Sequence, residues 1–409
     1  MQKSLIAEPQ VRFPGFMGPW NCQKLGTITD FVTGKAFSSE LSDNGTYIVM
    51  DMGSVGKDGN RIETKTTNVE RDLLCTNDLI MPKDDIGGGY IIGRTAYIPA
   101  NEKYVLGDHV YRLRFEKEYG LFIHYQINSD YIRRQIKPIV TGSAQLGLNA
   151  KNLQKINVSI PCFEEQQTIA DFLSLVDEVI EANEAEVQNL ETQKKVLMKK
   201  IFSQEVRFKR EDGTDFPEWE DVTVLDMLIQ PITDGPHETP KFVENGIPFV
   251  SVESIENGRI NFDKKRGNIT REYDELCAKK YKPQLYDVYM VKSGATTGKL
   301  AIVTIEADFN IWSPLAAMRT ASRAEAFFLF YMLQSDLLQK QVWTKLSLGN
   351  QPNLGMRALE EFDAVRPCLE EQKLIADFLS NFDEAISAAK KELVLWKKLK
   401  KGLLQQMFV

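Results

Sequence analysis

The chain has 409 residues, which is too long for one hydrophobic core, because single domains rarely exceed about 250 residues. Its 43% apolar and 26% charged residues are typical of a globular protein and exclude a disordered or collagen-like chain. A net charge of −7 gives no sign of a general affinity for nucleic acid. No long apolar run predicts a membrane span, Met1–Gln10 lacks a secretory pattern, and five scattered cysteines are expected to be reduced thiols, so a cytoplasmic protein is expected.

Residues 1–160 are predicted to form a first head of mixed α/β structure. Short runs rich in β-branched and aromatic residues predict strands at Tyr47–Met50 and Tyr90–Ile92, and a helix is predicted at Gly120–Gln135. The order of the strands does not follow from the sequence. With 19 basic and 17 acidic residues this head is close to neutral, so an anion-binding surface on it would have to be local.

Residues 161–205 are predicted to form a spacer region made of one long helix with an apolar seam. From Ile169 onward, alternating steps of four and three residues reach ten positions, eight of them apolar, which is typical of a coiled coil. Glu164 and Glu165 fall in the expected first turn, where the helix dipole favours negative charge. The predicted seam side chains are Ile169, Leu173, Val176, Ile180, Val187, Leu190 and Leu197.

Residues 206–366 are predicted to form a second mixed α/β head, with little sequence similarity to the first. Strands are predicted at Phe249–Val252, Val288–Val291 and Leu300–Thr304, and a helix at Glu325–Lys345. With 20 basic and 24 acidic residues, this head is slightly acidic.

Residues 367–409 repeat the first helical segment. Six-residue blocks beginning at Pro161 and Ile169 recur at Pro367 and Ile375, both with an offset of 206 residues. The second seam comprises Ile375, Leu379, Phe382, Ile386, Leu393, Trp396 and Leu403.

A helix of about 40 residues is about 60 Å long and would leave its seam exposed if it stood alone. We therefore expect an α+β chain in which the two long helices form an antiparallel intramolecular coiled coil with a pseudo-two-fold repeat. Lys194 and Lys400 occupy equivalent seam positions. They are expected to extend to the rim of the pair, and a role in register or partner binding is the alternative.

The residue patterns of common active sites are absent from the sequence. Gly294–Leu300 resembles a phosphate-binding loop but has one residue too few between its glycines and no Ser or Thr after Lys299. No HExxH or paired His/Cys spacing predicts a metal site, and no Asn/Asp-Pro-Pro-aromatic tetrapeptide predicts an amino-methyltransferase. The acidic pair Asp84–Asp85 is expected to be a solvated surface feature. These absences favour a binding protein.

Each head is followed by Pro-x-x-Glu-Glu-Gln-x-x-Ile-Ala-Asp-Phe-Leu-Ser and a long helix, and this arrangement resembles the specificity subunit of type I restriction–modification enzymes. Within the second head, Asp234–Lys241 and Lys292–Lys299 resemble stretches common in the target recognition domains of that family. Gly87–Arg94 fits more loosely at the corresponding place in the first head. By this resemblance, 1–160 and 206–366 are target recognition domains.

The resemblance implies that each head reads one half of a bipartite, asymmetric site in double-stranded DNA. It implies that the helices set the spacing of the halves and dock two modification subunits. It also implies that this chain is not an enzyme and holds no cofactor. In such systems the modification subunits use S-adenosylmethionine for adenine-N6 methylation, and motor-nuclease restriction subunits use ATP and Mg²⁺.

DNA reading requires side chains that reach base edges and phosphates, so basic and polar residues of predicted loops are the candidates. In the first head they are Lys35, Ser38, Lys57, Arg61, Lys83 and Arg94. In the second they are His237, Thr239, Lys241, Lys264, Lys265, Arg266, Lys292, Thr296 and Lys299. A solvated surface side chain is the alternative for each. Two other functions are weighed for the chain, a coiled-coil adaptor that binds only proteins and an enzyme with unusual motifs.

Overall fold

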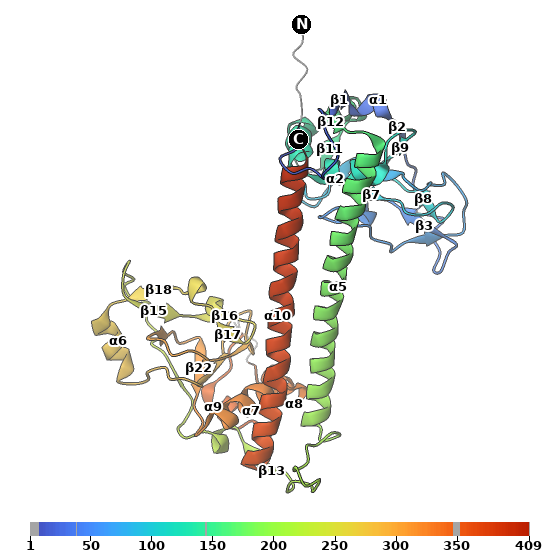
Figure 1. Cartoon of the computed structure of the whole chain (residues 1–409). Coiled ribbons are helices and arrows are strands. Elements are labelled where there is room, and N and C mark those ends of the chain that lie inside the picture. The colour runs from blue at the N-terminus through green and yellow to red at the C-terminus, as the bar shows by residue number, and fades with distance from the viewer. Residues whose placement is uncertain (1–7, 38, 144, 347–351, 409) are drawn as a thin grey trace. The chain divides into compact units, whose positions relative to one another are not determined.

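The computed structural model describes residues 8–37, 39–143, 145–346 and 352–408, and Figure 1 labels its elements. The chain divides into two compact units, one formed by residues 1–184 with 391–409 and the other by residues 185–390. Each unit therefore contains one head together with part of each long helix. We refer to them as the first and second unit.

The head of the first unit is built on a four-stranded antiparallel sheet and a three-stranded mixed sheet. The four-stranded sheet has the order β2 (Thr29–Thr33), β9 (Val110–Phe115), β5 (Leu79–Pro82), β7 (Ala96–Tyr97). The mixed sheet has the order β4 (Thr66–Thr67), β3 (Tyr47–Met50), β8 (Tyr104–Leu106), and β3 and β8 run parallel. A smaller sheet has the order β10 (Val140–Thr141), β11 (Leu146–Leu148), β6 (Asp84–Asp85), and β1 (Asn21–Lys24) pairs with β12 (Asn157–Ile160). The helices are α1 (Leu25–Ile28), η1 (Met52–Ser54), α2 (Gly120–Asn128), α3 (Asp130–Ile136), η2 (Lys137–Ile139) and α4 (Ala150–Leu153).

The head of the second unit repeats this topology. Its four-stranded antiparallel sheet has the order β14 (Thr233–Asp234), β22 (Leu315–Met318), β19 (Val288–Val291), β20 (Leu300–Ile302). The mixed sheet has the order β18 (Gly267–Ile269), β15 (Ile247–Val250), β21 (Asn310–Ile311), again with one parallel pair. The remaining strand pairs are β13 (Glu220–Thr223) with β23 (Asp363–Arg366), and β16 (Ile255–Glu256) with β17 (Arg259–Ile260). The helices are η3 (Leu225–Met227), η4 (Val252–Ser254), η5 (Phe262–Lys264), α6 (Arg271–Ala278), α7 (Arg323–Gln334), α8 (Asp336–Lys345) and α9 (Met356–Glu360). Two heads with divergent sequences thus share one arrangement of sheets.

The predicted strands agree with the structure except in one loop and at three ends. Tyr47–Met50 and Val288–Val291 form strands with the predicted bounds. The strand predicted at Phe249–Val252 lies two residues earlier, at Ile247–Val250, and the strand predicted at Leu300–Thr304 ends two residues early. The predicted strand Tyr90–Ile92 is wrong, because this segment is a turn. Its amide groups are bound by the side chain of Asp85 rather than by a neighbouring strand.

The single helix predicted late in each head is in fact two helices that meet at a serine. Ser129 separates α2 from α3 and Ser335 separates α7 from α8, each with an extended ψ near 155°. The hydroxyl of each serine donates to the carbonyl three residues earlier, at 2.6 Å in both heads. An aspartate follows each serine, a pattern that favours the start of a new helix.

The antiparallel coiled coil is confirmed within each unit. Helices α5 (Phe163–Phe202) and α10 (Leu369–Met407) have 40 and 39 residues. In the first unit Lys400 of α10 pairs with Asp177 of α5, and in the second unit Lys194 of α5 pairs with Asp383 of α10. Every predicted seam side chain is buried or half-buried.

The prediction that Lys194 and Lys400 extend to the rim is wrong. Their ammonium groups lie 2.5 Å from Asp383 and Asp177, and both side chains are largely buried. A tyrosine of the neighbouring head, Tyr331 of α7 or Tyr125 of α2, donates a hydrogen bond to the same aspartate at 2.7 or 2.8 Å. Burial raises the pKa of both tyrosines, so they remain donors at neutral pH. The lysines therefore contribute to the register of each head on the helices.

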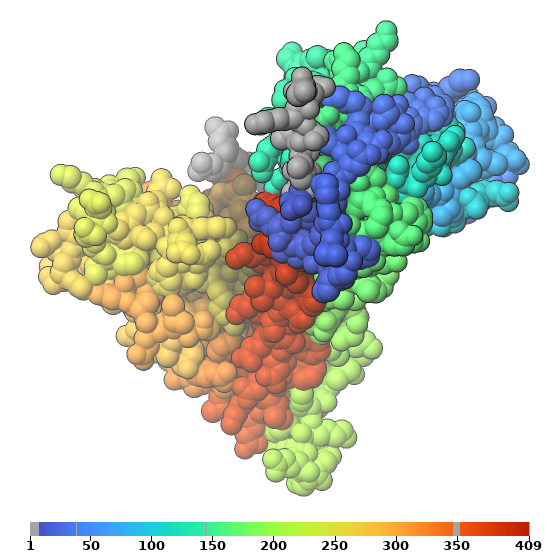
Figure 2. Space-filling model, turned by 45° about the horizontal axis from the view of Figure 1, so that its top comes forward, coloured from blue at the N-terminus to red at the C-terminus, as the bar shows by residue number. Residues whose placement is uncertain are grey.

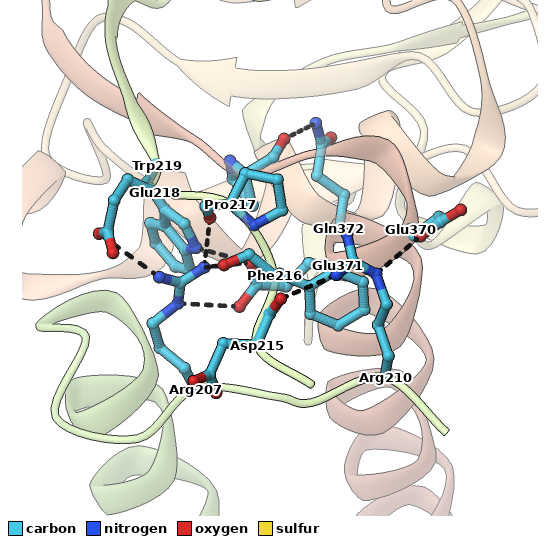
Figure 3. Close-up of polar contacts among 11 residues, drawn as sticks. Arg207, Arg210, Asp215, Phe216, Pro217, Glu218, Trp219, Glu370, Glu371 and Gln372 are labelled. Atoms are coloured by element: carbon cyan, nitrogen blue, oxygen red, sulfur yellow. Dashed lines mark hydrogen bonds and ion pairs between the residues drawn. The ribbon is translucent and has the colours of Figure 1, made fainter. Parts of the chain in front are cut away.

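A second repeated contact joins each head to the first turn of the helix that follows it. In Figure 3 the guanidinium of Arg207 lies against the carboxylate of Glu371, at 2.9 Å, and the indole N–H of Trp219 donates to the same carboxylate at 2.9 Å. In the first unit Arg12 and Trp20 bind Glu165 in the same way, at 2.7 and 3.3 Å. The second of the two predicted first-turn glutamates is therefore a buried acceptor in both units.

The core of each head is completed by both long helices. In the first unit Ile169 and Leu173 of α5 pack in one cluster with Met407 of α10 and Phe408. In the second unit Ile375 and Leu379 of α10 join Ile201 and Phe202 of α5. The end of each long helix is thus part of a head core, and the apolar seam is continuous with the packing of the heads.

Removal of the Glu371 carboxylate is expected to destabilise the second unit. Glu371→Ala leaves the charge of Arg207 and the N–H of Trp219 without their common acceptor in a site where Glu371 is 0% exposed. We expect a loss of about 3 kcal/mol in the free energy of unfolding, measured by chemical denaturation. The control is the exposed neighbour Glu370→Ala, expected to cost less than about 0.5 kcal/mol. Equal effects of the two variants would contradict this assignment.

Candidate nucleic-acid interface

Each head presents a glycine-rich loop at the same place in its four-stranded sheet. In the first head, 83–95 connects β5 to β7, and in the second, 292–299 connects β19 to β20. The strands β5 and β19 occupy equivalent positions in sheets of the same order. The first residue of each loop is a lysine, Lys83 or Lys292, and both were among the predicted contacts.

In the first head Lys83 belongs to a cluster centred on Asp84. The ammonium of Lys83 lies 2.6 Å from Asp84 Oδ2, and Nδ1 of His109 lies 2.7 Å from the same oxygen. Partial burial opposes ionisation of Asp84, but the hydrogen bonds from Lys83 and His109 outweigh it, and the pKa of Asp84 is lowered. The carboxylate therefore holds a lysine and a half-exposed histidine together at the start of the loop.

The second head has a similar cluster around a buried aspartate in β14. Nζ of Lys292 and Nε2 of His237 each lie 3.3 Å from Asp234 Oδ2, and Lys280 donates to the other oxygen. Asp234 is 0% exposed, whereas His237 projects into solvent. Lysine, aspartate and histidine thus meet at the start of the glycine loop in both heads, although the aspartate and histidine come from different positions.

A cavity of about 740 Å³ lies beside the second head's loop. It gathers three of the predicted residues, Lys264, Thr296 and Lys299. Sequence analysis missed Gln334 and Gln339, which line the same cavity from the α7–α8 region. Amide and ammonium groups around a cavity are suited to hydrogen bonding with base edges and phosphates. The break between α7 and α8 brings these glutamines there, and no pattern in the sequence indicated it.

The remaining predicted residues of the second head do not form one group. Arg266 stacks on Trp312 and lies 3.3 Å from Glu253. Within the cavity, Lys264 is paired with Glu256 at 2.7 Å. Thr239 and Lys241 are exposed, and Lys265 is half-buried.

In the first head, Arg61 binds Glu63 and the carbonyl of Tyr97, which favours a structural role. Lys35 is exposed, and Ser38 lies outside the described residues.

The first head's loop is fixed at its base by Asp85. This side chain is 2% exposed and accepts hydrogen bonds from the backbone N–H groups of Gly87, Ile91 and Ile92 at 2.6, 3.0 and 3.3 Å. Burial opposes ionisation of Asp85, but these backbone donors outweigh it and lower its pKa. The expectation that Asp84–Asp85 is merely a solvated pair is therefore wrong, because local N–H groups replace water around Asp85.

Three basic side chains surround this loop. Nζ of Lys57 lies 4.5 Å from the centre of the Tyr90 ring, and Nε of Arg94 donates to the carbonyl of Tyr90 at 3.1 Å. Arg133, which sequence analysis missed, donates to the carbonyl of Ile92 at 2.6 Å. Burial, and then the charge of Arg94, lowers the pKa of Arg133 to about 10. Two partly desolvated guanidinium groups thus create a local positive potential in a nearly neutral head.

The repeated architecture is matched by comparison with known proteins. The sequence matches the family described as type I restriction modification DNA specificity domain over residues 17–192 and again over 218–395. The chain belongs to the type I restriction enzyme specificity subunits. As such it is a non-catalytic component of a restriction–modification system, and the family's DNA specificity domain occurs in it twice.

Relatives of this specificity subunit align over most of its length. The MjaVIII specificity subunit of Methanocaldococcus jannaschii is 25% identical in an alignment that covers 94% of this chain and 91% of the relative. The putative MjaX specificity subunit of the same organism is 27% identical over 51% of this chain and 49% of the relative. The crystal structure of an S subunit from M. genitalium superposes with a TM-score of 0.65 at 14% identity, covering 98% of this chain and 99% of that one.

Among the described residues there is neither a membrane-spanning helix nor a metal site. In the part of the chain that the structure describes, no helix is long and apolar enough to cross a membrane. Among the same residues, no group of three or more His, Cys, Asp or Glu side chains is arranged to hold a metal ion. The groups that form the candidate interface are the basic and amide side chains described above.

Substitution of Asp85 is expected to release the first head's loop. Asp85→Ala leaves three backbone N–H groups without their acceptor, at a cost of about 1–3 kcal/mol. We expect amide hydrogen exchange in residues 86–92 to become about tenfold to a hundredfold faster. Asp43→Ala, at an exposed position of the same head, is the control and should leave this exchange unchanged. Unchanged protection in both variants would show that Asp85 does not anchor the loop.

Proposed function

We propose that this specificity subunit selects DNA by letting each head read one half of a bipartite, asymmetric site. The observation that carries the proposal is the pair of equivalent glycine loops, 83–95 and 292–299, which occupy one topological position but carry different side chains. A shared frame allows both heads to approach DNA in the same way, while different loops read different bases. A coiled-coil adaptor that binds only proteins gives no reason for basic groups to gather at these loops.

The long helices set the distance between the half-sites in this proposal. Helices of 40 and 39 residues are about 60 Å long, and one turn of B-DNA is about 34 Å for roughly 10 base pairs. A spacer of this length suits half-sites more than one turn apart. The buried Lys194–Asp383 and Lys400–Asp177 pairs support a fixed rather than a sliding helix register.

The same helices dock two modification subunits in this proposal. Figure 2 shows that one face of α10 lies at the molecular surface. Leu395 and Leu399, one helical turn apart on α10, are 65% and 48% exposed, and Val196 of α5 is 48% exposed. Exposed apolar side chains on a charged helix favour a protein partner, on α10 in the first unit and on α5 in the second. A solved structure whose fold is similar to this chain, with a TM-score of 0.53 at 17% identity over 95% of this chain and 97% of that one, concerns complex assembly of the type I R-M system.

The cofactors belong to the partners in this proposal. Modification subunits use S-adenosylmethionine to methylate adenine N6, and motor-nuclease restriction subunits use ATP and Mg²⁺. The chain alone is expected to bind DNA weakly, because Lys83, Lys264, Arg266 and Lys292 already face carboxylates. Much of the phosphate contact would then come from the modification subunits, so binding by the isolated chain should depend less steeply on salt than binding by the assembled complex.

Exchange of one head is expected to change one half-site only. Residues 206–366 are replaced by the second head of another family member, and the modified adenines are mapped by methylome sequencing in a host that also makes the modification subunit. The second half-site should change while the first half-site and the spacer remain, because each head has its own core. The reciprocal exchange of residues 1–160 is the control. A change in both halves after either exchange would rule out independent reading.

Lengthening both helices by one heptad is expected to lengthen the spacer. Seven residues add about 10.5 Å, or about 3 base pairs, and keep the apolar seam in phase. The two half-sites should stay the same in the methylome. As a control, an insertion of five residues rotates the seam by about 140° out of phase and should abolish methylation. If the heptad variant kept the original spacer, the helices would not set it.

A further inference from the structure

The first head exposes two large apolar side chains at the tip of an ordered loop. Ile86 and Tyr90 are 70% and 58% exposed, and they flank Gly87, Gly88 and Gly89. Two large apolar side chains exposed together on one loop form a local apolar surface that can contact a partner. Their position on the glycine loop, rather than on a sheet or helix face, makes them the most protruding apolar groups of this loop.

The loop is held in shape before any partner binds. Asp85 fixes both ends of the turn through the N–H groups of Gly87, Ile91 and Ile92. Gly88 and Gly89 have φ values of +93° and +84°, which side-chain-bearing residues rarely adopt. A loop that is already ordered loses little conformational entropy on binding, so its apolar tip can contribute its contact energy to affinity.

The basic side chains around the tip favour DNA as the partner. Lys57, Arg94 and Arg133 lie around it, and no described carboxylate forms an ion pair with any of the three. Asp58 and Asp130 are near enough to favour the charge of Arg94, but neither pairs with it within 4.0 Å among the described residues. Unpaired cations attract phosphates, while an exposed aromatic ring can stack on a base.

We propose that the loop of residues 85–92 inserts Ile86 and Tyr90 between bases of the first half-site and opens the stack there. This inference rests on the proposed DNA-reading function. Apolar wedges unstack base steps in other proteins, and stacking on an aromatic ring contributes about 1–3 kcal/mol per base. Lys57 and Arg94 contact the adjacent phosphates and hold the duplex against the tip.

The inference predicts a difference between the two half-sites. The equivalent loop of the second head, 292–299, contains apart from its lysines no side chain larger than threonine. It can approach the duplex closely but has no wedge. A wedge from this chain therefore opens the base stack in the first half-site, and the second half-site has no such wedge.

The test uses the full chain assembled with its modification subunit and duplexes that carry the site found by methylome sequencing. 2-Aminopurine is placed at successive positions in each half-site. The adenine that is methylated in each half-site is left out of this series, because methyltransferases take their target base out of the stack. At the other positions, the wild-type complex should increase the fluorescence at one step of the first half-site only. The Ile86→Ala/Tyr90→Ala double variant should lose this increase and bind the intact duplex about tenfold to a hundredfold more weakly.

A mismatch at the responding step separates wedging from a structural effect. Because a mismatched step is already partly unstacked, it should restore binding of the double variant to within a few-fold of wild type. Ile62→Ala/Tyr131→Ala, which removes exposed residues of the same types from the same head, is the control and should bind the intact duplex normally.

Two outcomes overturn the wedge, and they differ from failure of the proposed function. Equal weakening on intact and mismatched duplexes, or no fluorescence change with the wild-type complex, would show that the tip does not enter the stack. In both cases a bipartite methylated site would still be found. If the wild-type complex methylated no bipartite site at all, the DNA-reading function itself would be wrong.

Discussion

Burial of the apolar seam shared by α5 and α10 is the constraint on which the rest of this specificity subunit depends. Neither helix can be stable alone in water at this length with a continuous apolar face. The structure meets this constraint by making the seam part of each head's core, through Ile169 and Met407 in one unit and Ile201 and Ile375 in the other. The pairing of the two helices and the folding of the heads therefore depend on the same buried apolar contacts.

The polar contacts that repeat in both units are those that place a head on the helices. Glu165 and Glu371 each accept from an arginine and a tryptophan, and Asp177 and Asp383 each join a lysine to a tyrosine. Buried charges of this kind are costly unless fully paired, so all partners must be retained together. The same set of contacts therefore positions both heads on the helices, although the loops of the two heads differ.

The glycine loops show how such a frame permits variation at the proposed DNA-reading surface. The first head's loop is longer, is anchored by Asp85 and exposes Ile86 and Tyr90, whereas the second is short and lies beside a polar cavity. Neither loop contributes to the seam. Side chains there can change without disturbing the packing that positions the heads, which is the physical basis for one family reading many DNA sequences.

The sequence by itself determined the repeat, the two long helices and their seam, because periodicity and the offset of 206 residues are properties of the chain. It also indicated Lys292 and Lys299 through the glycine-rich turn that they flank, and Lys83 as a basic residue of a predicted loop. The tertiary structure alone decided that Ser129 and Ser335 divide helices, that Asp85 is buried, and that Gln334 and Arg133 reach the loops. Those features depend on contacts between residues distant in the chain, and a sequence carries no local signal for such contacts.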